Sequence, residues 1–183
     1  MSFNEEYTES DNCRRGRRVL FVCLGNICRS PAAEGVMRSL LDEKGESSMW
    51  EVDSVGTGGW HVGQLPDKRM RIHARERGLE LTHRCRQIRP ADFSRFDWIV
   101  GMDAQNIADL RELAPTPDDE RKILPMGRFL DPLKGYDYVP DPYYEGSEGF
   151  ELVLDLLEGG CSRLHDFIEA EAENTAAGGC AAL

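Results

Sequence analysis

A short loop between an apolar run and a helix start constrains this chain more than any other feature. Residues 19–22 are apolar, with a valine at each end, which is typical of a buried parallel strand. Ser30 can then cap a helix that has Pro31 at its first position, where a missing N–H costs nothing. Because Gly25 relieves steric crowding, the loop amides can turn toward one centre at the positive end of the helix dipole. Such a centre suits a dianionic oxyanion.

Two side chains give this loop its chemistry. Arg29 can bind two phosphate oxygens at once, and Cys23 lies at the floor of the loop, where amides, dipole and guanidinium favour a thiolate. A thiolate beneath a phosphate is a nucleophile, and phosphoryl transfer to sulfur splits one difficult displacement into two easier ones. The alternatives are a buried structural cysteine and a zinc site on Cys23 and Cys28. The second is weak because the chain offers no convincing second cysteine pair and Arg29 repels a divalent cation.

The loop is not alone in the sequence. The pattern Cys-x5-Arg-Ser at residues 23–30 resembles the active-site loop of the low-molecular-weight protein tyrosine phosphatases. Far along the chain, the segment Asp-Pro-Tyr-Tyr at residues 141–144 is similar to the general-acid loop of that family. The segments Trp-His-Val-Gly at 60–63 and Met-Asp at 102–103 also resemble family segments, so the resemblance covers roughly residues 18–169. It implies a phosphotyrosine protein phosphatase I-like fold, and hydrolysis of phosphotyrosine and aryl phosphates through a phosphocysteine, without metal or cofactor.

The resemblance also implies a role for each matching residue. Cys23 is the nucleophile, Arg29 the phosphate clamp, and Asp141 the general acid that protonates the departing tyrosine oxygen and later activates water. The loop and three aromatic walls form the substrate-binding set: Leu24, Gly25, Asn26, Ile27, Cys28, Ser30, Trp60, Tyr143 and Tyr144. Three residues hold the loop from behind: Asn26, Ser30 and His83, although a purely structural role for the histidine is an equal alternative. Asp103 and Asn106 are most simply capping residues.

Cys28 is close to Cys23 in the loop and is not needed for displacement. We expect it to act as a resolving thiol that traps oxidised Cys23 as a disulfide, the alternative being that it merely packs in the loop.

Three rival functions use the same fold or site. Arsenate reductases need additional exchange cysteines, and only Cys85 lies in the corresponding region. Protein arginine phosphatases carry threonine in place of Ile27 and lack the double tyrosine, and a non-catalytic phosphate-binding module would have lost catalytic residues.

Composition sets the limits of this interpretation. The chain has 183 residues, enough for one domain, and 22 basic against 33 acidic residues give a net charge of −11, which argues against nucleic-acid binding. Four arginines, at positions 14, 15, 17 and 18, are interpreted as a solvated, flexible flank of the first strand. No run of about 18 apolar residues and no acid-poor leader are present, so we expect a cytoplasmic protein with no membrane partner and reduced cysteines. The expected partners are phosphotyrosine-containing proteins, with phosphate ion as product.

The hydrophobic pattern predicts an α/β fold, namely a doubly wound parallel sheet of about four strands with helices on both faces. The predicted strands are 19–22, 51–55, 98–100 and 122–124, and the predicted helices start near residues 30, 66, 104 and 150. Gly159 and Gly160 are expected to bend the last helix. The predicted organisation is a flexible extension at 1–17, a phosphatase domain at 18–169 and a flexible tail at 170–183.

Overall fold

The fold rests on a sheet of four parallel strands. The structure, a computed structural model, describes residues 16–179 and the side chains of residues 16–174. The strands run in the order β2-β1-β3-β4. Their bounds are Arg18–Cys23 for β1, Glu51–Gly56 for β2, Trp98–Gly101 for β3 and Ile123–Pro125 for β4. The predicted four-stranded parallel α/β sheet is confirmed.

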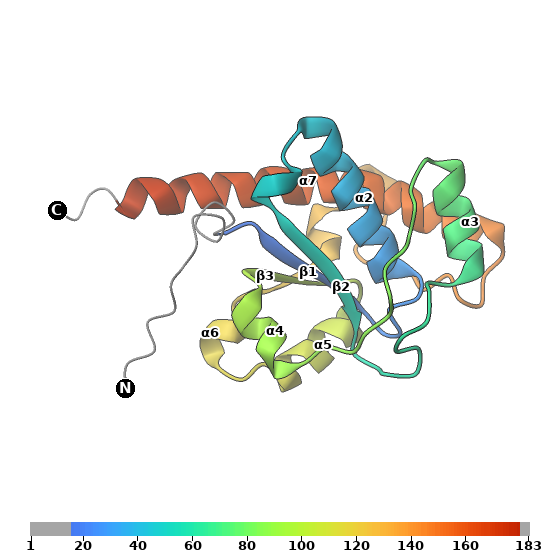
Figure 1. Cartoon of the computed structure of the whole chain (residues 1–183), viewed down its shortest axis with the longest axis horizontal. Coiled ribbons are helices and arrows are strands. Elements are labelled where there is room, and N and C mark those ends of the chain that lie inside the picture. Colours follow the sequence, from blue (N-terminus) through green and yellow to red (C-terminus); the bar gives the residue numbers. More distant parts are fainter. Residues whose placement is uncertain (1–15, 180–183) are drawn as a thin grey trace.

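Helices cover both faces of this sheet (Figure 1). One face carries α2 (Arg29–Lys44), α3 (Lys68–Glu76) and α7 (Ser147–Gly179). The other face carries α4 (Pro90–Arg95), α5 (Ala104–Leu113) and α6 (Pro117–Glu120). Three short 3-10 helices complete the description: η1 (Ser47–Met49), η2 (Met126–Phe129) and η3 (Pro132–Lys134). None of the helices in the described part of the chain is long and apolar enough to cross a membrane.

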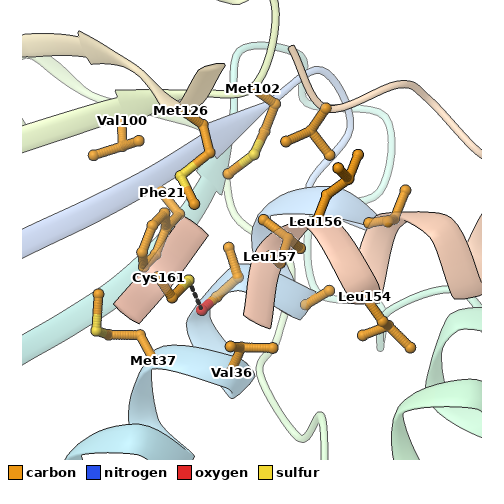
Figure 2. Packing of buried hydrophobic residues seen from close by; sticks show 14 of the residues in the cluster. Phe21, Val36, Met37, Val100, Met102, Met126, Leu154, Leu156, Leu157 and Cys161 are labelled. Atoms are coloured by element: carbon orange, nitrogen blue, oxygen red, sulfur yellow. Dashed lines mark hydrogen bonds between the residues drawn. The ribbon is translucent and has the colours of Figure 1, made fainter. Parts of the chain in front are cut away.

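The central strand β1 is buried on both faces, which explains its continuous apolar sequence. Phe21 points toward α2 and α7, where it packs with Met37, Met126 and Leu157 (Figure 2). Leu20, the preceding residue, belongs to the smaller core on the opposite face. A strand held from both sides in this way is a rigid base for the loop that leaves its carboxyl end.

The structure differs from the sequence predictions at several boundaries. Ser30 is not a helix cap, because α2 begins at Arg29 and the N-cap position is Cys28, which makes no side-chain cap bond. Residues 170–179 are not a loose tail but continue α7, which the two glycines do not interrupt. A side chain at Gly160 would come within 2.6 Å of Met126 Cε, so this glycine allows α7 to pack closely on η2. The rest of the predicted tail, 180–183, lies outside the described residues.

Two arginines of the predicted basic cluster make specific contacts with the rest of the fold. Arg17 forms two hydrogen bonds to Glu169 at 2.6 and 2.8 Å, and this contact holds the pKa of that carboxyl below its usual value. Arg18 contacts Asp97 through its backbone and its guanidinium. These two arginines therefore fasten β1 to α7 and to the start of β3 rather than forming a flexible flank. The other two arginines of the predicted cluster, and residues 1–15 in general, lie outside the described residues.

Candidate active site

A cavity of about 250 Å³ lies at the carboxyl end of β1. Its floor is the loop between β1 and α2. Parallel α/β sheets bind phosphate at this place, where a strand ends and the next helix begins. Two segments distant in sequence complete the walls, one after β2 and one before α7. The lining residues are Cys23, Leu24, Gly25, Ile27, Cys28, Arg29, Trp60, His61, Asp141, Tyr143 and Tyr144.

Cys23 is the last residue of β1, and its side chain is almost fully buried. Its Sγ lies 3.0 Å from the hydroxyl of Ser30, which also lies 3.1 Å from the carbonyl of Val55. The serine has a single hydroxyl proton for two acceptors, and an ionised sulfur is a stronger acceptor than a carbonyl. Ser30 can therefore turn its proton toward Cys23 whenever the thiolate is present.

Asn26 adopts a left-handed backbone conformation in the loop. Its φ of 56° makes it the one non-glycine residue among 16–179 with a positive φ, a conformation that asparagine tolerates better than most side chains. The fully buried amide group makes four hydrogen bonds. Its Nδ2 donates to Ser30 at 2.9 Å and to Ser54 at 3.0 Å, and its Oδ1 accepts from the Arg86 backbone at 2.9 Å and contacts His83 Nε2 at 3.0 Å. The network fixes the shape of the loop from behind.

A cluster that could offer three ligands to a metal ion lies behind the loop. His83 Nδ1 is 3.2 Å from Glu34 and 3.5 Å from Asp53. The negative charge of each carboxylate is already balanced by an arginine, since Arg38 pairs with Glu34 and Arg86 pairs with Asp53. We interpret the cluster as an ion network that supports Asn26. Among the side chains described, Cys23 and Cys28 belong to no metal-binding group.

Arg29 is the first residue of α2, and only 3% of its surface is exposed. Its Nη1 donates to Asp103 at 2.5 Å and to the carbonyl of Val139 at 3.3 Å, and its Nη2 donates to Asp141 at 2.9 Å. Burial alone would lower the pKa of Arg29, but the negative charges of Cys23, Asp141 and Asp103 outweigh it and raise the pKa. The guanidinium therefore stays charged and is held in one position at the cavity wall.

The remaining walls are aromatic and largely open to solvent. Trp60 is 70% exposed and Tyr144 is 94% exposed. Tyr143 packs edge-on against Tyr144, with ring centroids 5.0 Å apart, and Arg69 lies over its ring at 5.3 Å. The backbone N–H of Tyr143 donates to Asp141 Oδ1 at 3.1 Å, so the same short segment places a carboxylate and an aromatic ring at the cavity. The arrangement suits a flat ring that carries a phosphate.

Comparison with known proteins identifies the family. A family model described as low molecular weight phosphotyrosine protein phosphatase matches residues 18–174. The chain belongs to this family. A low molecular weight phosphotyrosine protein phosphatase of Drosophila melanogaster is 50% identical over 147 residues, covering 80% of this phosphatase and 93% of the relative.

Solved structures extend the comparison to the fold. A protein tyrosine phosphatase from Entamoeba histolytica is 40% identical with a TM-score of 0.81, over 85% of this phosphatase and 99% of the solved chain. A Drosophila arginine phosphatase is 34% identical with a TM-score of 0.76, over 81% of this phosphatase and 96% of the solved chain. The fold is therefore common to structures named as phosphatases for two different amino acids, tyrosine and arginine.

The phosphatase brings together most of the residues predicted from its sequence. Cys23, Arg29 and Asp141 meet at the cavity, as do the predicted aromatic walls. Asn26 and Ser30, predicted both to bind substrate and to hold the loop, do not line the cavity, and the side chains of both serve the second role. Trp60, Tyr143 and Tyr144 line the cavity, together with the other predicted lining residues: Leu24, Gly25, Ile27 and Cys28.

The sequence interpretation missed three contributions. Asp103 caps α5 as predicted, accepting from the Asn106 backbone at 2.8 Å, but its second oxygen pairs with Arg29. Gly56 ends β2, and a side chain there would come within 2.7 Å of the Leu24 carbonyl. His61 lines the cavity although no role was assigned to it. His61 and Asp103 had a signal in the sequence, because each stands inside one of the resembling segments, whereas Gly56 had none.

Proposed function

We propose that this phosphatase hydrolyses phosphotyrosine in proteins, and simpler aryl phosphates, through a phosphocysteine intermediate. The observation that supports this most strongly is the meeting of Cys23, Arg29 and Asp141 at one aromatic-walled cavity. They supply a nucleophile, a bidentate cation and a proton donor, which together are the groups that displacement at a phosphate monoester needs.

In the first step the Cys23 thiolate attacks phosphorus and a sulfur–phosphorus bond forms. The bond between phosphorus and the tyrosine oxygen breaks, and its electron pair stays on the oxygen. A phenol with a pKa of about 10 leaves poorly as an anion, so the protonated carboxyl of Asp141 donates its proton to this oxygen. Arg29 binds the equatorial oxygens of the phosphoryl group throughout.

In the second step water attacks the phosphorus of phosphocysteine. The carboxylate of Asp141 takes a proton from the water, the sulfur–phosphorus bond breaks, and its electron pair returns to Cys23. Ser30 can stabilise the leaving thiolate because its hydroxyl lies 3.0 Å from the sulfur. Inorganic phosphate leaves, and the protonated Asp141 is ready for another turnover.

The rival activities are less well supported. Ile27 presents an apolar side chain at the cavity, and Tyr143 and Tyr144 add aromatic surface, which favours a phosphotyrosine ring over a donor-rich phosphoarginine. Cys85 is buried and donates to the Asn26 carbonyl at 2.7 Å, and burial raises its pKa to about 11. Cys85 is not among the described residues that line the cavity, whereas Cys28 is, so Cys85 is poorly placed for the thiol exchange that an arsenate reductase needs.

A substrate panel tests the proposal. Purified protein is assayed with phosphotyrosine, phosphoserine and phosphoarginine peptides and with arsenate plus thiol reductant. We expect phosphotyrosine to be strongly preferred, with phosphoserine poor because its short stem does not reach from the aromatic walls to the loop. Faster hydrolysis of phosphoarginine than of phosphotyrosine would move the enzyme to the arginine phosphatases.

The expected partners and compartment belong to the same proposal. Phosphotyrosine-containing proteins are the substrates and phosphate ion the product. A catalytic thiol has to stay reduced, and the four described cysteines, Cys23, Cys28, Cys85 and Cys161, are all free. Reduced thiols are typical of the cytoplasm, which supports that compartment.

A further inference from the structure

The turn after β2 contains an unusual contact between a glycine and an aromatic ring. A Cβ atom built on Gly58 would lie 1.9 Å from Trp60 Cζ3, 2.4 Å from Cε3 and 2.6 Å from Cη2. The indole ring therefore occupies the space that a side chain at position 58 would take. The same ring lines the cavity above Cys23.

We propose that Gly58 is a specificity-determining position of this phosphatase, because its missing side chain sets where Trp60 stands in the cavity wall. The inference rests on the proposed function and names a residue that tunes it. Trp60 is 70% exposed, so few neighbours restrain its ring, and the face laid on Gly58 is one of its contacts with the protein. A methyl group at position 58 would overlap the indole ring in its present position, so the ring would have to move.

Gly58 could also act through its backbone, and the two routes can be separated. Its N–H donates to the Leu24 carbonyl at 2.8 Å, which ties the turn to the catalytic loop. Alanine keeps this N–H, and the φ angle of Gly58 lies outside the left-handed region, so alanine is compatible with the backbone. The clash at Gly58 is with the far end of an exposed side chain, which can rotate away. The clash at Gly56 is with the Leu24 backbone, which cannot.

The ring position matters only for substrates that touch the ring. Phosphate itself binds the loop and Arg29 and has no aromatic part, whereas phosphotyrosine places its ring between the cavity walls. Displacing Trp60 should therefore weaken the binding of a phosphotyrosine peptide and leave the binding of inorganic phosphate unchanged. An aromatic contact of this kind is worth roughly 2- to 12-fold in affinity.

The test is a double-mutant cycle with wild type, Gly58→Ala, Trp60→Ala and the double variant. For each protein, kcat and KM are measured on one phosphotyrosine peptide, and the inhibition constant is measured for inorganic phosphate. We expect each single variant to lower kcat/KM by about 2- to 12-fold, mainly through KM, and the double variant to match Trp60→Ala alone. Gly159→Ala is the matched control, because a Cβ at this position of α7 meets nothing within 4 Å.

Several results would overturn the inference. If Gly58→Ala lowered kcat/KM equally in the Trp60→Ala background, or weakened phosphate binding, Gly58 would act through the Leu24 backbone instead. Wild-type kcat/KM in Gly58→Ala would show that the ring position has no effect. Acrylamide quenching of tryptophan fluorescence reads the ring without turnover, and unchanged quenching in Gly58→Ala would also contradict the inference. Failure of wild type to hydrolyse the peptide would instead reject the proposed function.

Discussion

Replacing Asp141 by asparagine separates the two roles that the structure gives to this residue. Asparagine keeps the shape of the side chain but carries no negative charge and no proton to donate to a phenolate. We expect phosphotyrosine hydrolysis to slow by on the order of 10²- to 10⁴-fold, which is the usual size of a general-acid contribution. The loss should be smaller for an aryl phosphate with a strongly activated leaving group, because such a leaving group needs little protonation.

The same variant should bind phosphate more tightly. Asp141 accepts from Arg29 Nη2 at 2.9 Å, so in the ligand-free enzyme it competes with phosphate for the guanidinium. The Asp141 side chain is 45% exposed, which limits the pair to about 0.2–1 kcal/mol. Freeing Arg29 should therefore lower the inhibition constant for inorganic phosphate by roughly 1.4- to 5-fold.

Steady-state assays on the two substrates, with phosphate as competitive inhibitor, measure all three quantities. Asp141→Ala is the comparison variant, since it also removes the carboxylate but leaves no amide to contact Arg29. Equal losses on activated and unactivated substrates would refute the general-acid role. Weaker phosphate binding in Asp141→Asn would refute the competition for Arg29.

Three further predictions concern the loop. Ile27→Thr should raise kcat/KM for phosphoarginine relative to phosphotyrosine by roughly 5- to 150-fold, which is the range expected when one buried hydrogen-bond donor gains a partner. An unchanged ratio of the two kcat/KM values in a substrate panel would show that Ile27 has no part in selectivity. Burial, together with Asp67 and Cys23, raises the pKa of Cys28, so formation of the Cys23–Cys28 disulfide after a peroxide pulse should become faster as pH rises. The Cys28→Ser variant should hydrolyse substrate at a normal rate, but its activity should not be recovered by a dithiol after the pulse. Full recovery of activity in this variant would reject the resolving role. Gly56→Ala should weaken phosphate binding, unlike Gly58→Ala, because its new methyl group meets the Leu24 carbonyl.

The sequence predicted the central sheet well because its two inner strands, β1 and β3, are short, apolar and largely buried. Alternate residues of β1 belong to two different cores, so every position from 19 to 22 has to be apolar, and the run is easily recognised. The short helices α4 and α6 were missed, since neither is long enough to show a helical period. The extension of α7 to Gly179 was also missed, because small and polar residues carry no apolar stripe that marks a helix.

The site was predicted where chemistry follows from a local pattern and missed where it follows from packing. Cys23 and Arg29 are close in sequence, and Asp141 was found through the resemblance of its segment. The capping role of Asp103 was predicted from its position before a helix, but its second oxygen reaches Arg29 only because the ends of β1 and β3 lie side by side in the sheet. The contact between Gly58 and Trp60 depends on a side-chain rotamer, which no sequence pattern specifies.

The most direct test of the covalent mechanism is to locate the phosphoryl group during turnover. In Asp141→Asn the base for the second step is absent, so an activated aryl phosphate should phosphorylate the enzyme faster than water releases it. After a rapid quench, peptide mass spectrometry should find the phosphoryl group on Cys23, and the Cys23→Ser variant should bind phosphate but form no covalent product and show no turnover. A phosphoryl group on another residue, or a Cys23→Ser enzyme with a tenth or more of wild-type activity, would contradict the covalent mechanism.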